Sequence, residues 1–408
     1  DGIRDRSPSR GLGDVYKRQS TNSFLHSVAI ISSTKLRGSL VLTGKIEVLP
    51  SLKQIQTWGK EFGFSSVGIS NIDLSEESSA FIRWLRKGYA GDMTYLKRNI
   101  KKRLHPELLV PETHRVISVT MDYLPPNSDP KKTLKDKKKA YIARYALGRD
   151  YHKKMRKQLA KLAQKIGLSI PYQKYRVFAD SAPVLEKPLG MKANLGWIGK
   201  NTLLLNKGQG SWFFLGEIFT NAPLKVNQST AENDCGKCSA CISVCPTNAI
   251  ISPGELDARR CIAYLTIEHK GVIPVALRSL IGNRVFGCDD CQIFCPVNRH
   301  PTYATSSDFF PRNNLECSSL LDLFKMSEGE FERVTRGSAI RRINYDQWQR
   351  NLAIGIGNSD YGDLAIKLLT ERMKTCSDMV AEHIDWAIRR LKSSAVSSQN
   401  EKVIPVNL

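Results

Sequence analysis

Ten cysteines are present in this chain, and eight of them fall between residues 235 and 296. The first four form a Cys-x2-Cys-x2-Cys-x3-Cys-Pro run that ends at Pro246. Three more form a Cys-x2-Cys-x3-Cys-Pro run that ends at Pro296, and Cys261 stands alone between the two runs. Loops this short hold several sulfur atoms close together, so the spacing predicts a metal centre with thiolate ligands.

Two 4Fe–4S clusters fit this spacing best. In a run of the first type, three thiolates bind one cluster, the fourth reaches a second cluster, and the other run supplies the reciprocal ligands. The proline after each run cannot extend a hydrogen-bonded segment, so it turns the chain away from the cluster. The predicted ligands are Cys235, Cys238, Cys241 and Cys295 for one cluster, and Cys245, Cys261, Cys288 and Cys291 for the other.

Zinc and disulfide bonds are the alternatives for these cysteines. Zinc knuckles would take four cysteines per metal at Cys-x2-Cys spacing and would not need two Cys-Pro endings. Disulfide bonds occur mainly in secreted proteins, and the apolar stretch at residues 24–33 is a poor secretory signal, so disulfide bonds are disfavoured here. It is short, it is interrupted by His26 and Ser27, and no small-residue cleavage site follows it. Thiolate clusters fit a reducing compartment, so we expect a cytoplasmic protein.

The chain is strongly basic, with 61 Lys and Arg against 39 Asp and Glu and a formal net charge of +22. Such an excess suggests a polyanionic partner, with nucleic acid as the first candidate. A basic enzyme without such a partner is the alternative. No apolar run reaches membrane-spanning length, so no membrane contact is expected.

The length of 408 residues suggests two or three domains. Alternating helical and strand patterns follow residue 48, which indicates an α/β or α+β domain, and the pattern is all helical from residue 318 to 391. We expect a disordered or non-native leader at residues 1–48, the α/β (α+β) domain at 49–228, a ferredoxin-like two-cluster domain at 229–302, an all-α HEAT-like repeat at 303–392 and a disordered tail at 393–408.

Local patterns place the individual elements of the first domain. A hairpin is expected between residues 196–205 and 210–219, and a polar loop with six lysines at 125–139. The glycines at 196, 199, 210 and 216 allow close approach to something large and flat, or simply punctuate a core hairpin. The other elements are expected to be helices at 52–62, 79–87, 95–103 and 153–166, and strands at 65–69, 115–121 and 175–178.

Asp180 follows the expected strand at 175–178. An acidic residue at a strand end stands where α/β folds place reactive groups. The alternative is that Asp180 or Ser181 caps a helix that has Pro183 in its first turn, and spacing alone favours this cap.

Each iron–sulfur cluster transfers one electron at a time. A protein that only carried electrons would need no more than the cysteine-rich region. The large domain before that region and the basic helical region after it therefore suggest a second redox centre with a bound substrate. Several motifs lie outside or across the cysteine runs. They are Ala-Arg-Tyr-Ala-Leu-Gly-Arg-Asp-Tyr-His at 143–152, Asp-Ser-Ala-Pro-Val at 180–184, Gly-Lys-Asn-Thr-Leu at 199–203, Gly-Ser-Trp at 210–212, Leu-Gly-Glu-Ile at 215–218, the segment 281–296, and the Arg-Asn and Gly-Asn pairs at 350–351 and 357–358.

In combination with the cysteine runs, these motifs resemble the epoxyqueuosine reductases, cobalamin-dependent iron–sulfur enzymes of tRNA modification, over residues 49–392. The resemblance implies reduction of epoxyqueuosine to queuosine at the wobble position of tRNA, with cobalamin fed by two 4Fe–4S clusters. It makes Asp180 the proton donor, with a pKa raised by burial. The matching cobalamin contacts are Arg103, Ala143, Asp180, Leu204, Leu215 and Phe219.

The resemblance also implies partners. Phosphates of the tRNA would contact the lysines at 131–139 and a basic C-terminal region, and we expect a monomer that takes electrons from a flavodoxin or ferredoxin. The chain has no Asp-x-His-x-x-Gly motif, so no histidine ligand below the cobalt is indicated. A cobalamin-dependent reductive dehalogenase and a ferredoxin-like electron carrier are the alternative functions. The arginines of the C-terminal region are Arg333, Arg336, Arg341, Arg342, Arg350, Arg389 and Arg390.

Overall fold

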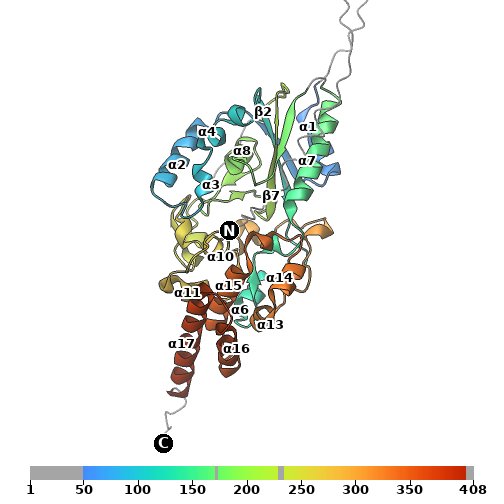
Figure 1. Cartoon of the computed structure of the whole chain (residues 1–408). Coiled ribbons are helices and arrows are strands. Elements are labelled where there is room, and N and C mark those ends of the chain that lie inside the picture. Colours follow the sequence, from blue (N-terminus) through green and yellow to red (C-terminus); the bar gives the residue numbers. More distant parts are fainter. Residues whose placement is uncertain (1–48, 171–172, 228–233, 401–408) are drawn as a thin grey trace, which may run out of the picture. The chain divides into compact units, whose positions relative to one another are not determined.

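A four-stranded antiparallel sheet organises the first part of the molecule (Figure 1). The computed structural model describes residues 49–170, 173–227 and 234–400, so the predicted leader at 1–48 and the boundary at 228/229 lie outside the described residues. The strands follow the order β1-β2-β7-β4, and seven of the eight residues of both β2 and β7 are buried. Their bounds are Ser66–Ser70 for β1, Arg115–Asp122 for β2, Phe213–Thr220 for β7 and Tyr175–Phe178 for β4.

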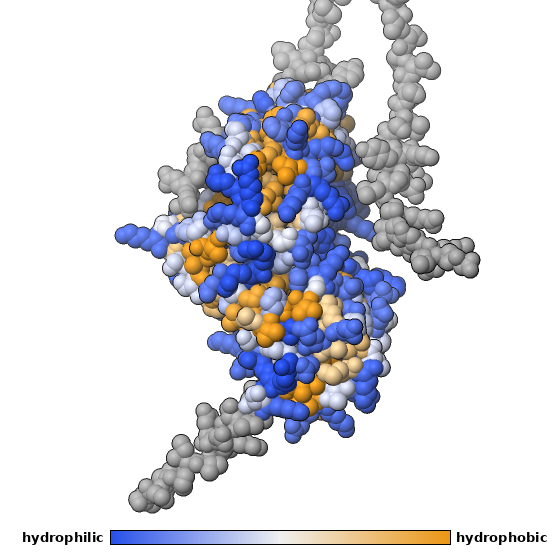
Figure 2. Space-filling model, turned by 60° about the vertical axis from the view of Figure 1, so that its left-hand side comes forward, coloured by the Kyte–Doolittle hydropathy of each residue, from blue (hydrophilic) through white to orange (hydrophobic). Residues whose placement is uncertain are grey.

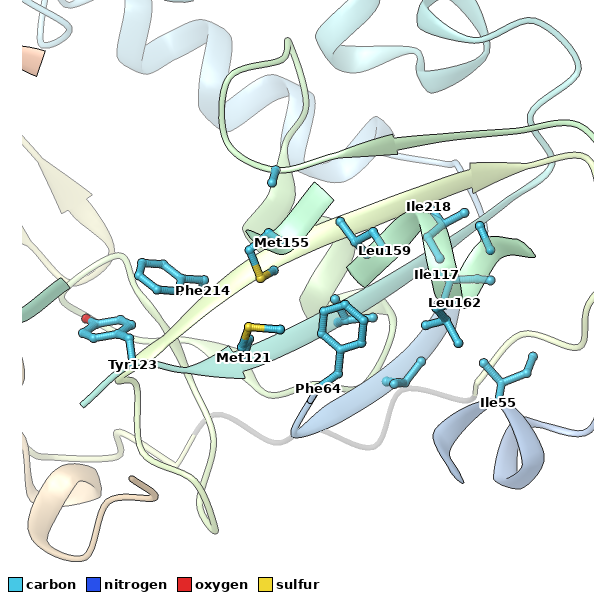
Figure 3. Close-up of a cluster of buried hydrophobic side chains, with 14 of the residues drawn as sticks. Ile55, Phe64, Ile117, Met121, Tyr123, Met155, Leu159, Leu162, Phe214 and Ile218 are labelled. Carbon is cyan, nitrogen blue, oxygen red and sulfur yellow. The ribbon is translucent and has the colours of Figure 1, made fainter. Parts of the chain in front are cut away.

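Both faces of the sheet are covered by helices. Helices α1 (Leu52–Glu61) and α7 (Tyr151–Gly167) cover one face, where Met155, Leu159 and Leu162 of α7 pack against β2 and β7 (Figure 3). The short helix α8 (Glu186–Lys192) packs on the other face against β1, β2 and β7. Because both faces are buried, the central strands are apolar on both sides, and a charged side chain among them requires an explanation.

The predicted hairpin is only partly correct. Strand β5 (Trp197–Ile198) pairs with β6 (Leu204–Leu205), whereas β7 pairs with β2 and β4 instead of with β6. The glycines in this region pack against the protein itself. A Cβ at Gly196 would lie 2.0 Å from the Leu205 carbonyl oxygen, and one at Gly216 would lie 2.9 Å from Leu159 Cδ1. Close backbone packing within the core therefore accounts for these glycines.

The cysteine-rich region is joined to the preceding domain by backbone pairing. Strand β10 (Arg284–Phe286) pairs in parallel with β3 (Tyr141–Ile142), and the side chain of Phe309, in the region expected to form the helical domain, is buried in the core beneath the large sheet. The three regions that were expected to be separate domains therefore pack against one another. Figure 2 shows that apolar surface patches are separated by hydrophilic side chains.

The C-terminal region is helical, as predicted. Helix α15 (Tyr345–Gly357) is buried from Gln347 onward and packs against α13 (Leu320–Lys325) and α17 (Asp378–Asn400). Helix α17 extends beyond the expected end at residue 392. No helix within the described ranges is long and apolar enough to cross a membrane. The HEAT-like assignment stays a prediction.

Two further local predictions need correction. The helix expected at 95–103 is divided into α3 (Thr94–Lys97) and α4 (Ile100–Leu104), because Asn99 adopts a left-handed conformation with φ 55°. The lysine-rich loop contains a short helix, α6 (Pro130–Lys135), which Asp129 caps at its N-terminus. The remaining elements are α2 (Ser75–Arg86), α5 (Pro106–Leu109), η1 (Arg144–Ala146), α9 (Ala240–Val244), β8 (Ile250–Ser252), β9 (Glu255–Leu256), η2 (Ala258–Arg260), α10 (Ile262–Ile267), α11 (Val275–Ile281), α12 (Asp290–Ile293), η3 (Pro296–Arg299), η4 (Ser307–Phe309), α14 (Glu328–Val334), η5 (Ala339–Arg342) and α16 (Asp363–Met373).

Candidate active site

Asp180 lies just beyond the end of β4 and directs its carboxylate toward the first turn of α7. Its backbone is left-handed, with φ 61°, a conformation that aspartate tolerates better than most residues. Its Oδ2 accepts hydrogen bonds from the Tyr151 hydroxyl at 2.7 Å and from His152 Nε2 at 3.1 Å, while the side chain remains 57% exposed. Helix α8 begins only at Glu186, so the capping alternative is wrong.

His152 is held between two carboxylates. Its Nδ1 lies 2.6 Å from Asp150 Oδ1, and its Nε2 faces Asp180. Because an imidazole donates from both nitrogens only when it is protonated, this geometry favours the imidazolium. Burial lowers the pKa of His152, but the hydrogen bonds to Asp150 and Asp180 outweigh that effect and raise the pKa to about 9. The ring therefore holds a proton at neutral pH.

The same contacts change the expected state of Asp180. Burial raises the pKa of Asp180, but the hydrogen bonds from His152 and Tyr151 prevail and hold it below its ordinary value. The predicted increase in the pKa of Asp180 is therefore wrong. In this arrangement Asp180 is a carboxylate, and the transferable proton next to it resides on His152.

Two more carboxyl groups lie behind Asp180. Glu186 Oε1 accepts a hydrogen bond from the Asp180 backbone N–H at 2.6 Å, and burial raises the pKa of Glu186 to about 7. Glu217, in the middle of β7, is fully buried, and burial raises its pKa well above the ordinary value. Lys187 donates to the Thr202 carbonyl oxygen at 2.7 Å, away from these carboxyl groups.

The cysteines of the two runs gather in two groups. Burial raises the pKa of Cys241, and the negative charges of Cys295, Cys235 and Cys238 raise it further. Burial and the charges of Cys261, Cys241 and Cys245, among others, raise the pKa of Cys291 in the same way. These interactions place thiols of each predicted ligand set near one another, and the assignment of each cysteine to a cluster stays a prediction.

Several contacts fix the loops around these thiols. Trp197 Nε1 lies 3.5 Å from Cys235 Sγ, and the Ala249 N–H lies 3.2 Å from Cys245 Sγ. Within residues 49–170, 173–227 and 234–400, no three His, Cys, Asp or Glu side chains converge on one metal ion. The ligands of a 4Fe–4S cubane bind separate iron corners, so they need not converge on one ion.

The expected cobalamin contacts differ in accessibility. Arg103 is 8% exposed and donates to the Val184 carbonyl oxygen, while its Nε has no partner in the described part of the chain. An under-satisfied guanidinium fits the amide and phosphate oxygens of a corrinoid. Leu215 is only partly buried. The side chains of Ala143, Leu204 and Phe219 are buried, so these three residues can offer only backbone atoms or support from behind.

A basic cavity of about 610 Å³ lies beside this site. Arg149 directly precedes Asp150, whose backbone N–H donates to the Gly337 carbonyl oxygen at 2.7 Å. The cavity is therefore linked to the Asp150–His152 pair through adjacent residues. Its lining residues are Arg149, Arg312, Asn313, Asn314, Arg333, Val334, Arg336 and Gly337.

Arg350 does not belong to the basic surface that the sequence suggested. It is fully buried and donates to the carbonyl oxygens of Leu265, His269 and Gly271. Its role is to hold the segment at 261–271 against α15. Glu268 of that segment pairs with Arg342. Burial and the charge of Asp289 raise the pKa of Tyr145, and the charges of Asp180 and Glu268 raise it further. The end of the segment thus lies toward the Asp180 side.

Sequence patterns assign no individual role to four residues at this site: Tyr151, His152, Glu186 and Glu217. One signal was available for Glu217, because an acidic residue in the middle of an apolar eight-residue strand is uncommon. No local signal marks the contact between His152 and Asp180, which the packing of α7 against β4 and β7 creates.

The fold and the two cysteine groups define a class of iron–sulfur protein that joins a two-cluster region to an α+β domain with a charged site. Residues 234–298 match the 4Fe–4S double cluster binding domain, and residues 103–181 match the family described as epoxyqueuosine reductase QueG, DUF1730.

The relatives identify the family more closely. An epoxyqueuosine reductase of Pseudomonas aeruginosa is 51% identical over 338 residues, which cover 83% of this chain and 94% of that relative. The solved structure of an epoxyqueuosine reductase with an epoxyqueuosine-modified tRNA-Tyr stem loop has 26% identity, a TM-score of 0.76 and coverage of 87% and 94%. A Bacillus subtilis epoxyqueuosine reductase with an aspartate-bearing catalytic loop swung out of the active site has 26% identity, a TM-score of 0.75 and coverage of 86% and 92%. The chain belongs to the epoxyqueuosine reductase family.

Proposed function

We propose that this protein reduces the epoxide of epoxyqueuosine in tRNA to the alkene of queuosine. The observation that carries the proposal is the hydrogen-bonded Asp150–His152–Asp180 arrangement in a chain that belongs to this family. Both C–O bonds of the epoxide break, a carbon–carbon double bond forms, and the oxygen leaves as water. The reaction takes two electrons from an external one-electron donor and two protons from the protein.

His152 and Asp180 supply the first proton. The imidazolium gives its Nε2 proton to Asp180, and Asp180 presents it to the oxygen that leaves the ring carbon. Asp150 keeps the imidazole oriented through Nδ1, and the Tyr151 hydroxyl fixes the position of Asp180 Oδ2. Proton delivery matters because an unprotonated alkoxide is a poor leaving group.

Cobalamin is the second redox centre that we infer. Arg103, Asp180 and Leu215 would hold it with their side chains, and Ala143, Leu204 and Phe219 would contribute backbone atoms or packing. When bound, cobalamin supplies a strongly reducing cobalt that donates electrons to the strained ring carbon. The reductive dehalogenase and electron-carrier alternatives are not favoured, because the matched relatives over most of the chain are named epoxyqueuosine reductases.

The cysteine groups suggest a direction for electron delivery. Cys238 is exposed, so a flavodoxin or ferredoxin would approach the group that contains it. Burial lowers the pKa of Lys187, and the charges of Glu186 and Cys291 act against that effect. The cysteine group that contains Cys291 therefore lies on the side of the molecule that carries Glu186 and Asp180. The ligand sets remain those predicted from the spacing. We also propose a monomer that acts in the cytoplasm, where its tRNA substrate is found.

The basic cavity is the surface that we assign to tRNA phosphates. Four arginines line it, two of them on the segment that also carries Gly337, next to the acid–base residues. Such contacts position a nucleic acid without reading its sequence, and they weaken as the salt concentration rises, because the release of counterions then becomes less favourable. The exposed lysines of residues 131–139 are a second candidate surface for the same backbone.

Complementation tests the proposal. A bacterial strain without its own epoxyqueuosine reductase would be transformed with this chain, and its tRNA would be digested and analysed by mass spectrometry. We expect queuosine to replace epoxyqueuosine. Persistence of epoxyqueuosine in cells where the protein is folded and carries its clusters would refute the proposed function.

A further inference from the structure

We propose that Lys200 raises the reduction potential of one of the two iron–sulfur clusters and thereby makes that cluster the point at which electrons enter the protein. The inference rests on the proposed function, which takes electrons from an external one-electron donor. Lys200 belongs to the Gly-Lys-Asn-Thr-Leu motif at 199–203, to which the proposed reaction assigns no role. The cluster in question is the one with the predicted ligands Cys235, Cys238, Cys241 and Cys295, called the entry cluster below.

The motif forms the tight turn between β5 and β6. The Gly199 N–H donates to the Leu203 carbonyl oxygen at 2.8 Å, and the Leu203 N–H donates to Asn201 Oδ1 at 3.2 Å. Asn201 is buried, and its Nδ2 donates to the Cys291 carbonyl oxygen at 3.2 Å. The turn is therefore fixed against the second cysteine run, and this fixes the position from which Lys200 extends.

Lys200 reaches the loop of the first cysteine run. Its Nζ donates to the carbonyl oxygens of Gly236 and Cys238, at 2.7 Å each. Both partners are neutral, and no carboxylate of residues 49–170, 173–227 or 234–400 forms an ion pair with this ammonium group. A positive charge therefore stands beside the ligand loop without an opposite charge to cancel it.

Trp197 adds a hydrogen-bond donor from the same hairpin. Its side chain is buried, and its indole Nε1 lies 3.5 Å from Cys235 Sγ. Reduction adds one negative charge to a cluster, so a nearby cation and an N–H group that faces a ligand sulfur both favour the reduced form. Lys200 and Trp197 thus act in the same direction on the entry cluster.

Two arginines beside the second cysteine group are each matched by a carboxylate. Arg284 donates to both oxygens of Asp290, at 2.7 and 2.5 Å, and Arg144 pairs with Glu316 at 2.7 Å. Asp289, whose Oδ2 accepts the Arg144 backbone N–H, adds one more buried carboxylate. The charges of these five residues do not favour an added electron, so the entry cluster should be the easier of the two to reduce.

The order of electron transfer follows from this difference. The external donor loses one electron to the entry cluster, whose core charge falls from 2+ to 1+ and returns to 2+ when the electron moves to the second cluster. Two such transfers supply the two electrons of the reaction. Cys238 is exposed, so the donor can approach the loop that Lys200 holds.

Lys200→Gln is the direct test, because it removes the charge and keeps an N–H donor for the loop. The full chain, reconstituted with iron and sulfide, would be titrated by potential and followed by electron paramagnetic resonance. We expect the equilibrium constant for reduction of the entry cluster to fall about tenfold, which is about 59 mV for a one-electron couple. Lys200→Arg keeps the charge and should titrate as the wild type does. Lys207→Gln is the matched control, because Lys207 lies in the same hairpin but is 86% exposed and pairs with Asp234.

Two further variants complete the test. Cys261→Ser, expected to retain only the entry cluster, identifies which of the two titration waves belongs to it. Trp197→Phe removes the N–H group and should move that wave in the same direction as Lys200→Gln.

The inference is overturned if neither wave moves in Lys200→Gln, or if Lys207→Gln moves the same wave as far. Loss of about four iron atoms from Lys200→Gln would also overturn it, because Lys200 would then only hold the loop in place. The titration contains no RNA, so it reports on the clusters even if the wild type leaves epoxyqueuosine unchanged, which is how failure of the proposed function would appear.

Discussion

Replacing Asp180 with asparagine removes the negative charge that faces His152 Nε2 while it keeps the size of the side chain. Two carboxylates hold the pKa of His152 at about 9 against the opposing effect of burial. Asp180→Asn removes one of these two charges, so the pKa of His152 should fall in the variant. Because the variant also lacks the group that presents the proton, turnover should fall by about 10²- to 10⁴-fold.

Two measurements check this prediction. The pKa is read by NMR of ring-labelled histidine, with the His152 signal among the seven histidines assigned from a His152→Asn variant. Turnover is read by mass spectrometry of an epoxyqueuosine stem loop after anaerobic reaction with the reconstituted enzyme. Glu371→Gln, an exposed change on α16 where Glu371 pairs with Lys374, is the control and should alter neither quantity. Unchanged turnover in Asp180→Asn would show that the assigned proton route is wrong, and an unchanged pKa of His152 would show that the ion pair does not form.

Three other changes should have separable effects. Cys261→Ser should lower bound iron from about eight to about four atoms per chain, because Cys261 completes one of two cubanes, and a full iron content would exclude Cys261 as a ligand. The double variant Arg333→Glu and Arg336→Glu should raise the Kd for the stem loop. The slope of log affinity against log salt concentration should become shallower by about one for each phosphate that the protein no longer binds. An unchanged slope would show that the RNA binds elsewhere. Turnover should fall as pH rises through about 9, because His152 then loses its proton. The two ion pairs of His152 should contribute their full stability to the fold below about pH 6.5, and that contribution should be lost as pH rises through about 9. A rate that is constant to pH 10 would contradict that assignment.

The two-cluster region could be predicted from the sequence because the spacing within each cysteine run is local. Three of the four thiolates of the first predicted set come from one short run, and two of the four in the second set come from the other run, so spacing alone indicates the cluster type. The helices that cover the sheet could be predicted for a similar reason, since α1 and α7 carry a regular apolar stripe.

The acid–base site could not be predicted in the same way, because distant segments build it. His152 lies in the first turn of α7, Asp180 follows β4, and Glu217 lies in β7, so only the sheet order brings them together. The sequence suggested a pKa of Asp180 raised by burial, whereas hydrogen bonds from Tyr151 and His152 lower it. The hairpin error has the same origin, because β7 takes partners that are up to about a hundred residues away in the chain.

Arg350 illustrates a limit of reading charge from the sequence. Basic residues in a helical region suggested a nucleic-acid surface, yet Arg350 is enclosed and satisfied by backbone carbonyl oxygens. The basic cavity combines Arg333 and Arg336 of the expected set with Arg149 and Arg312, which lie outside it. Burial, which sequence alone does not give, decides whether an arginine is structural or available to a partner.

The most direct test of the central claim uses purified protein reconstituted anaerobically with iron, sulfide and cobalamin. It would be supplied with a one-electron reductant and a tRNA stem loop that carries epoxyqueuosine, and the nucleosides would then be analysed by mass spectrometry. The account predicts loss of one oxygen atom to give queuosine, with no reaction when cobalamin is left out. Unaltered epoxyqueuosine in the presence of both clusters and cobalamin, or full conversion without cobalamin, would contradict it.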